Sequence, residues 1–169
     1  MLSDLSLHND LPIECISHKV EFVKTTLMNC DLNSTIGIRI ISTFNIDHKN
    51  IRNIPIIIHI HGGGFIAGST QNCLIYTRKF SKYTNIPIFS LEYRLAPKYQ
   101  YPSAIDDVFQ GYMWVLENSE KLYGIRPTKI IFIGDSAGAN LCISLCFLCI
   151  KKKLRKPDGV LLGYPRNFY

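Results

Sequence analysis

The segment from Lys129 to Asn140 restricts the possible folds of this chain more than any other. A β-branched apolar run ends at Gly134, the chain turns through Ser136, and an apolar segment of helical length follows. A serine on such a turn is held in a strained backbone conformation, and Gly134 and Gly138 let neighbouring backbone pass close to it. Gly-x-Ser-x-Gly between a strand and a helix is the pattern of a nucleophile elbow, so Ser136 is the candidate nucleophile.

A second glycine-rich motif lies upstream, where an apolar run at 54–60 leads directly into His-Gly-Gly-Gly-Phe at 61–65. This composition predicts a buried strand followed by an exposed loop. Glycines leave the backbone N–H groups unshielded, so Gly63 and Gly64, together with the N–H of Ala137, could bind a developing oxyanion. Each such donor typically contributes about 2.7–4 kcal/mol to transition-state stabilisation. The alternatives are a flexible turn or a phosphate-binding loop, but the glycine patterns of phosphate loops are absent.

Five motifs occur in one order along the chain. They are His-Gly-Gly-Gly-Phe at 61–65, Tyr-Arg-Leu-Ala-Pro at 93–97, Tyr-Pro-Ser-Ala-Ile-Asp-Asp at 101–107, Gly-Asp-Ser-Ala-Gly-Ala-Asn at 134–140 and Pro-Asp-Gly-Val-Leu-Leu-Gly-Tyr-Pro at 157–165. In this combination, residues 51–165 resemble the hormone-sensitive-lipase branch of the α/β hydrolases. The resemblance implies that His61 orders the oxyanion loop, with Gly62, Gly134, Asp135 and Gly138 as supporting motif residues. Lys98 departs from the family pattern, which has an acid there.

The resemblance and the alternation of apolar segments together predict an α/β-hydrolase fold, with a mostly parallel sheet and helices on both faces. Residues 1–169 are expected to form one partial domain, with 1–16 as a possible lid or N-terminal segment and 17–169 as the sheet and helices through the elbow. The domain is expected to be truncated after the strand that follows the nucleophile helix. Strands are predicted at 18–23, 35–42, 54–60, 86–93, 128–133 and 159–162, and helices at 70–84, from Pro102 or Ser103 with a capping box to Asp106, and from Ala137.

Composition excludes several classes of function. The formal net charge of +6 includes a basic run at 151–156, which is expected to be a solvated helix end, with a nuclear-targeting or anionic-membrane patch as the alternative. No motif supports nucleic-acid binding. The apolar segment at 141–150 is too short to span a bilayer. No secretory signal is expected at the N-terminus, so the predicted location is cytoplasmic.

Three of the six cysteines, Cys142, Cys146 and Cys149, share one face of the helix after Ser136. A metal site on that face would need a histidine or acidic partner, and none is nearby. These cysteines are therefore expected to be buried free thiols, as in a reducing compartment. No metal and no cofactor are expected.

The catalytic mechanism is incomplete in this sequence. A serine nucleophile needs a base and an acid that orients the base, and in this architecture the order is serine, acid, histidine. Beyond Ser136 the only acid is Asp158, and all five histidines precede the serine. His59 is expected on a strand, and His8, His18 and His48 on the surface. Asp135 is not taken as the triad acid, because the resemblance places that acid after a later strand.

Three interpretations therefore stay open. The first is a serine carboxylic-ester hydrolase, an esterase or lipase, that acts on a small-molecule ester through an acyl-enzyme on Ser136. The second is a non-catalytic small-molecule-binding relative that keeps the pocket. The third is an inactive fragment. The intact elbow and glycine loop favour the first, and the oligomeric state is left open.

Overall fold

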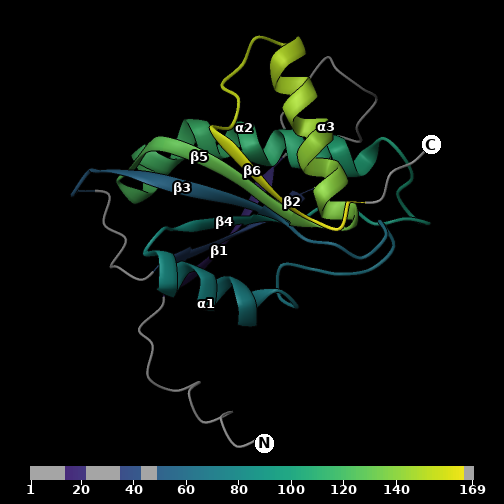
Figure 1. The fold of residues 1–169 in the computed structure, drawn as a ribbon, viewed down its shortest axis with the longest axis horizontal. Coiled ribbons are helices and arrows are strands. Elements are labelled where there is room, and N and C mark those ends of the chain that lie inside the picture. The colour runs from purple at the N-terminus through teal and green to yellow at the C-terminus, as the bar shows by residue number, and fades with distance from the viewer. Residues whose placement is uncertain (1–13, 22–34, 43–48, 166–169) are drawn as a thin grey trace, which may run out of the picture.

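A computed structural model describes residues 14–21, 35–42 and 49–165 of the chain. These residues form one six-stranded sheet with three helices, in the strand order β1-β2-β4-β3-β5-β6 (Figure 1). The strands are β1 (Glu14–Glu21), β2 (Thr35–Ser42), β3 (Arg52–Ile60), β4 (Ile88–Leu91), β5 (Ile125–Asp135) and β6 (Gly159–Gly163), and the helices are α1 (Leu74–Thr84), α2 (Ser103–Tyr123) and α3 (Ala137–Lys151).

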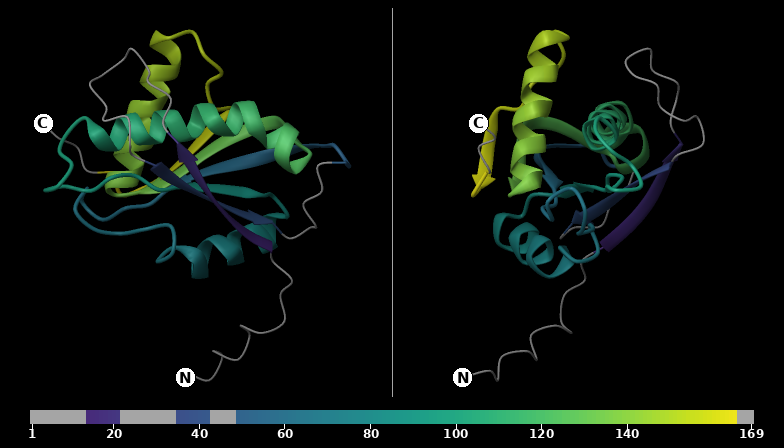
Figure 2. Two further views of the ribbon diagram at one scale, coloured as in Figure 1. Left: turned by 180° about the vertical axis from the view of Figure 1, so that it is seen from behind. Right: turned by 90° about the vertical axis from the view of Figure 1, so that its right-hand side faces the viewer.

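The sheet is mixed but mostly parallel. β1 pairs antiparallel with β2, and β2 pairs antiparallel with β4, whereas β4, β3, β5 and β6 run parallel to one another. Helix α1 lies on one face of the sheet, and α2 and α3 lie on the other (Figure 2). The predicted α/β-hydrolase architecture is thus confirmed, and the carboxyl ends of β3 and β5 lie side by side, with Ile60 opposite Gly134.

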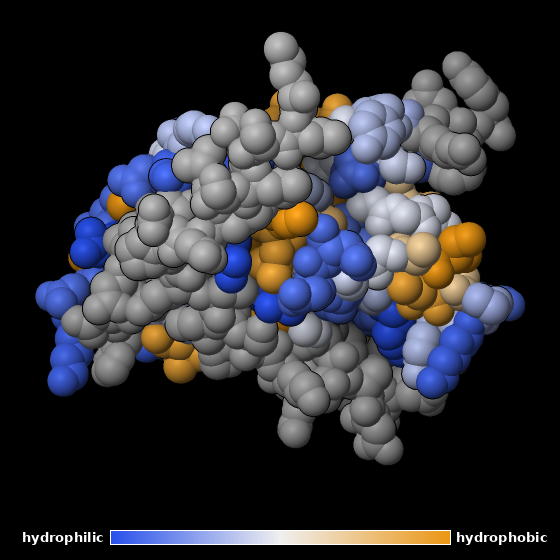
Figure 3. Space-filling view, turned by 90° about the horizontal axis from the view of Figure 1, so that it is seen from below, coloured by the Kyte–Doolittle hydropathy of each residue, from blue (hydrophilic) through white to orange (hydrophobic). Residues whose placement is uncertain are grey.

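Strand β3 is buried on both faces, as its continuous apolar run predicts. Ile56, Ile58 and Ile60 pack with the residues under α2 and α3, and Ile57 belongs to a smaller cluster under α1 that also contains Ile88. Seen from the α1 side, hydrophobic residues form separate patches between hydrophilic ones on the described surface (Figure 3). The larger of the two clusters lies between the sheet and helices α2 and α3, next to the turn that follows β5.

Some predicted details differ from the structure. Helix α1 begins at Leu74 rather than Thr70, and its buried residues are Thr77 and Ser81, whereas Tyr76 and Tyr83, which share helical spacing in the sequence, are exposed. Thr77 donates to the carbonyl of Cys73, and Ser81 donates to the carbonyl of Ile86. Polar residues can therefore face the sheet here because local carbonyls satisfy their hydroxyl groups.

Helix α2 starts at Ser103 as predicted, but the capping box does not form, because no side chain caps its first turn. Strand β1 begins earlier than expected. The predicted lid at 1–16 lies almost wholly outside the described residues, as does His48. On α3, Cys142 and Cys149 are buried, Cys146 is partly buried, and all three are free thiols.

Strand β6 is at the edge of the described sheet and carries exposed apolar side chains. Val160 and Leu161 are 49% and 57% exposed, and Phe147 and Ile150 of α3 are 67% and 61% exposed. An apolar edge strand with unpaired backbone groups favours pairing with another chain.

Because of this apolar edge at β6, we expect light scattering to show that the 169-residue chain self-associates as its concentration rises. Val160→Lys should reduce the association and Ile75→Lys on α1 should not. A stable monomer at all concentrations would contradict this expectation.

Candidate active site

Ser136 lies on the turn between β5 and α3, as its sequence context predicts. Its backbone has a φ of 50° and a ψ of −116°, a strained conformation for a residue that is not glycine. Its N–H donates to the carbonyl of Gly163 over 2.8 Å, and its own carbonyl accepts from the N–H of Asn140 over 3.1 Å. Hydrogen bonds to β6 and α3 therefore hold the turn that presents this serine.

The glycines on either side of Ser136 are required by close backbone contacts. A Cβ atom on Gly134 would lie 2.6 Å from the carbonyl carbon of Gly138. A Cβ atom on Gly138 would collide with the carbonyl oxygen of Ile60 and would lie 2.6 Å from that of His61. The first turn of α3 thus packs directly against the end of β3, where the glycine loop begins.

The glycine loop after β3 is exposed and has a compact, defined shape. Gly63 and Gly64 have φ angles of 121° and 64°, which favour glycine. The carbonyl of Gly63 accepts from the N–H groups of Ile66 and Ala67, and the carbonyl of Phe65 accepts from the N–H of Ala96 over 2.8 Å. The loop is therefore tied to itself and to the segment after β4, and is not a free glycine turn.

The structure brings the two glycine motifs together. A Cβ atom on Gly62 would collide with the carboxylate of Asp135 and would lie 2.8 Å from its carbonyl oxygen. Because Asp135 immediately precedes Ser136, the glycine loop passes beside the elbow. Tyr164 also donates to this carboxylate over 3.4 Å. The juxtaposition of loop and serine is the arrangement that an oxyanion site requires.

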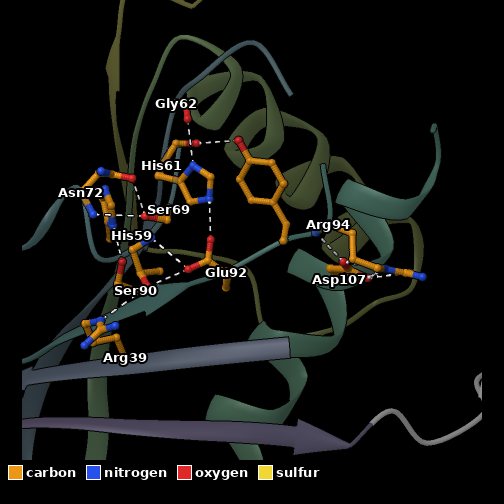
Figure 4. A network of polar contacts seen from close by, with 12 residues as sticks. Arg39, His59, His61, Gly62, Ser69, Asn72, Ser90, Glu92, Arg94 and Asp107 are labelled. Atoms are coloured by element: carbon orange, nitrogen blue, oxygen red, sulfur yellow. Dashed lines mark hydrogen bonds and ion pairs between the residues drawn. The ribbon is translucent and has the colours of Figure 1, made fainter. Parts of the chain in front are cut away.

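His61 is buried behind the loop and has two hydrogen-bonding partners. Its Nδ1 lies 2.8 Å from the carbonyl oxygen of Gly62, and its Nε2 lies 3.1 Å from Oε1 of Glu92 (Figure 4). Glu92 follows β4 and was not identified from the sequence. A signal was present, because an acid placed directly after an apolar parallel strand lies at the sheet edge where β3 also ends.

His59 lies on β3, as predicted, and is held by a separate buried network. Its Nδ1 lies 2.6 Å from Oγ of Ser90, and its Nε2 lies 2.6 Å from the hydroxyl of Tyr76. Burial, reinforced by the positive field of His61, lowers the pKa of His59 to about 3. His59 is therefore neutral at physiological pH, and its ring nitrogens are already occupied.

We expect the neutrality of His59 to make the chain less stable in acid. In the unfolded chain this group has a pKa near 6.5, against about 3 when folded, so protons bind the unfolded state preferentially between these values. The free energy of unfolding should fall as the pH drops below about 6.5, by up to about 1.4 kcal/mol per pH unit from this group. Urea titrations from pH 7.5 to 4.5 measure the slope. His59→Gln should flatten it, and an equal slope in that variant would refute the assignment.

The described residues do not bring a base to Ser136. Asp158, the only acid beyond the serine, precedes β6, at the opposite end of the sheet from the elbow. Its carboxylate accepts from the N–H of Ile130 over 2.9 Å and pairs with Lys129 and Arg155. Asp158 therefore joins the start of β6 to β5, and it does not orient a histidine among the described residues.

The described residues show neither a metal site nor a membrane-spanning helix. No group of three or more histidine, cysteine or acidic side chains in this part of the chain could hold a metal ion. None of the described helices is long and apolar enough to cross a membrane.

Known proteins with similar sequences belong to the same fold family. A family described as alpha/beta hydrolase fold matches residues 57–169. Hormone-sensitive lipase of Mus musculus is 36% identical over 118 residues, which cover 70% of this chain and 15% of the lipase. An esterase of Acinetobacter venetianus is 33% identical over 137 residues, which cover 79% of this chain and 44% of the esterase.

A solved structure agrees with these relatives. The hyperthermophilic esterase of the archaeon Pyrobaculum calidifontis superposes with a TM-score of 0.76 and 25% sequence identity, covering 90% of this chain and 44% of that protein. The chain thus spans less than half the length of the esterases that it matches, and about a seventh of the mouse lipase.

Proposed function

Because the chain belongs to the α/β-hydrolase fold family, we propose that it carries the nucleophile and the oxyanion site of a serine carboxylic-ester hydrolase. The observation that carries this proposal is the strained turn at Ser136 beside the exposed glycine loop. The esterase and lipase relatives support the same reaction class. The substrate would be a small-molecule carboxylic ester.

In the proposed reaction, Oγ of Ser136 attacks the ester carbonyl carbon and its proton passes to a base. The carbonyl oxygen becomes an oxyanion that accepts hydrogen bonds from the N–H groups of Gly63, Gly64 and Ala137. The tetrahedral intermediate collapses, the alcohol leaves with a proton, and an acyl group stays on Ser136. Water then releases the carboxylic acid by the same steps. The base is not provided by the described histidines, since His59 and His61 are bonded elsewhere.

The engagement of His59 and His61 with other partners favours a second candidate, a pocket that binds small molecules without hydrolysing them. Both functions use the same loop and the same turn, so the fold does not separate them. They differ in whether Ser136 reacts. A reagent that acylates or phosphorylates activated serines therefore distinguishes the two candidates.

The test is covalent labelling of the 169-residue chain with a fluorophosphonate, with imidazole as an added base. We expect mass spectrometry to locate the adduct on Ser136, because the adjacent N–H donors stabilise the phosphoryl oxygen as it gains charge. Ser136→Ala should remove this adduct. Ser144→Ala, on an exposed face of α3, is the matched control and should leave it unchanged.

Two results would contradict the hydrolase proposal. One is labelling that persists in Ser136→Ala at an equal rate. The other is an unlabelled Ser136 in a folded chain that still binds a non-hydrolysable ester analogue, which would favour the binding function.

A further inference from the structure

The imidazole of His61 lies between two hydrogen-bond acceptors. The side chain is fully buried, with the Gly62 carbonyl oxygen 2.8 Å from Nδ1 and Oε1 of Glu92 3.1 Å from Nε2 (Figure 4). A carbonyl oxygen can only accept, so Nδ1 carries a proton and donates it. The protonation of the ring then depends on what Nε2 faces.

Nε2 faces a carboxylate whose other hydrogen bonds favour its ionised form. The other oxygen of Glu92, Oε2, accepts from the N–H of Thr70 over 2.9 Å and from its hydroxyl over 2.7 Å. Burial acts to raise the pKa of Glu92, but the hydrogen bonds from His61 and Thr70 outweigh it and hold the pKa below its usual value. The two Thr70 donors favour the ionised form independently of the imidazole. An ionised carboxylate has no proton to give, so the geometry favours a second N–H donor at Nε2.

We propose that His61 is a buried imidazolium paired with Glu92, and that this ion pair positions the N–H of Gly63 for the oxyanion. The positioning of the oxyanion donor rests on the proposed esterase function. The charge on His61 rests on hydrogen-bond geometry alone. Glu92 is a positioning residue in this account, because it acts through His61 and does not touch the substrate.

The link from the ion pair to the oxyanion donor is the peptide bond between Gly62 and Gly63. This unit is planar and trans, so its C=O and N–H point in opposite directions. When Nδ1 of His61 holds the Gly62 oxygen, the N–H of Gly63 must point away from the imidazole. Gly68 closes this arrangement, since a Cβ atom there would collide with the Gly62 oxygen and lie 2.7 Å from Nδ1.

The groups that surround the imidazole are compatible with a positive charge. Tyr93 stacks on the ring with a centroid distance of 4.1 Å and an interplanar angle of 11°, and its aromatic face favours a cation. The Tyr93 hydroxyl also donates to the carbonyl of His61 over 2.9 Å. Asp135 adds a carboxylate beside Gly62. His59, two residues earlier on β3, is neutral and is bonded to Ser90 and Tyr76, so it does not compete for Glu92.

Nitrogen NMR of the histidine side chains tests the charge directly. Magic-angle spinning spectra of the 169-residue chain labelled with ¹⁵N-histidine do not require a monomer, and the signals lost in His61→Gln assign this residue. At pH 8 we expect two protonated ring nitrogens for His61. One nitrogen without a proton at pH 8 would overturn the proposal.

Substitution of Glu92 tests the cause of that charge. In Glu92→Gln the carboxylate charge is removed at nearly constant shape, so His61 should show only one protonated nitrogen at pH 8. Thr70→Val is the matched control, because it removes one hydrogen bond to Oε2 and leaves the carboxylate beside Nε2. It should keep both ring protons. A doubly protonated His61 in Glu92→Gln would overturn the role of Glu92.

Labelling kinetics test the positioning role. With imidazole present, the fluorophosphonate should react with Ser136 about 10-fold to 100-fold more slowly in Glu92→Gln, less than the loss of a whole oxyanion donor, and at an unchanged rate in Ser144→Ala. An unchanged rate in Glu92→Gln would overturn positioning of Gly63. A doubly protonated His61 in a chain whose Ser136 never reacts would instead refute the esterase proposal while the ion pair stands.

Discussion

Replacing Asp107 with alanine is expected to lower the free energy of unfolding by about 3–5 kcal/mol, the usual cost of removing one partner from a buried ion pair. The Asp107 side chain is 1% exposed, and its Oδ1 lies 2.7 Å from Nη2 of Arg94. The backbone N–H of Arg94 also donates to Oδ2 over 2.8 Å. Without the carboxylate, a largely buried guanidinium and a buried N–H lose these bonds together.

The effect of this substitution should reach the active site. Arg94 follows β4 and Asp107 lies in the first turns of α2, so their pair fixes the segment between the two elements. That segment contains Ala96, whose N–H donates to the carbonyl of Phe65 in the glycine loop. Slower labelling of Ser136 in chains that are still folded is therefore expected as well.

Urea denaturation followed by the fluorescence of Trp114, the only tryptophan, measures the loss of stability. Replacing both partners, as Arg94→Met with Asp107→Leu, is the control. It should cost less than the Asp107→Ala change alone, because neither buried charge remains. A loss below about 1 kcal/mol for Asp107→Ala would show that the pair is as weak as a surface ion pair.

The sequence predicted the parts of the fold in which each residue type fits only one structural environment, such as a buried strand or a close backbone contact. The apolar run of β3 is buried on both faces, so a parallel central strand was the consistent interpretation. At Gly134 and Gly138 any side chain would collide with backbone, and the Gly-x-Ser-x-Gly pattern identified this close packing without coordinates. Local pattern and tertiary packing agree in these segments.

The missed features depend on contacts between distant segments. The helical spacing of Tyr76 and Phe80 does not reveal that the Tyr76 hydroxyl bonds His59 while the side chain stays partly exposed. The sequence near Ser103 resembles a capping box, but Asp106 does not cap the helix. Glu92 was missed because its partners, His61 and Thr70, come from another strand end and another loop.

The 169-residue chain is expected to hydrolyse p-nitrophenyl acetate very slowly, although it carries the proposed nucleophile. Without base and acid, residual catalysis in serine hydrolases comes from the oxyanion site and from binding, and amounts to about 10³–10⁴-fold over the reaction in water. Complete enzymes reach accelerations of about 10⁶-fold or more. A shortfall of several orders of magnitude is therefore expected for this chain.

The reason for the shortfall is the proton on Oγ of Ser136. A neutral hydroxyl is a weak nucleophile, and both described histidines of β3 and the glycine loop are held by Ser90, Tyr76, Glu92 and Gly62. Imidazole added to the solution can take this proton in place of a protein base. Imidazole also hydrolyses the ester by itself, so the rate measured with Ser136→Ala is subtracted from the rate measured with the unchanged chain. The difference is the rate that depends on Ser136, and it should rise in proportion to the imidazole concentration. Fast turnover that depends on Ser136 without imidazole would mean that this chain does bring a base to the serine.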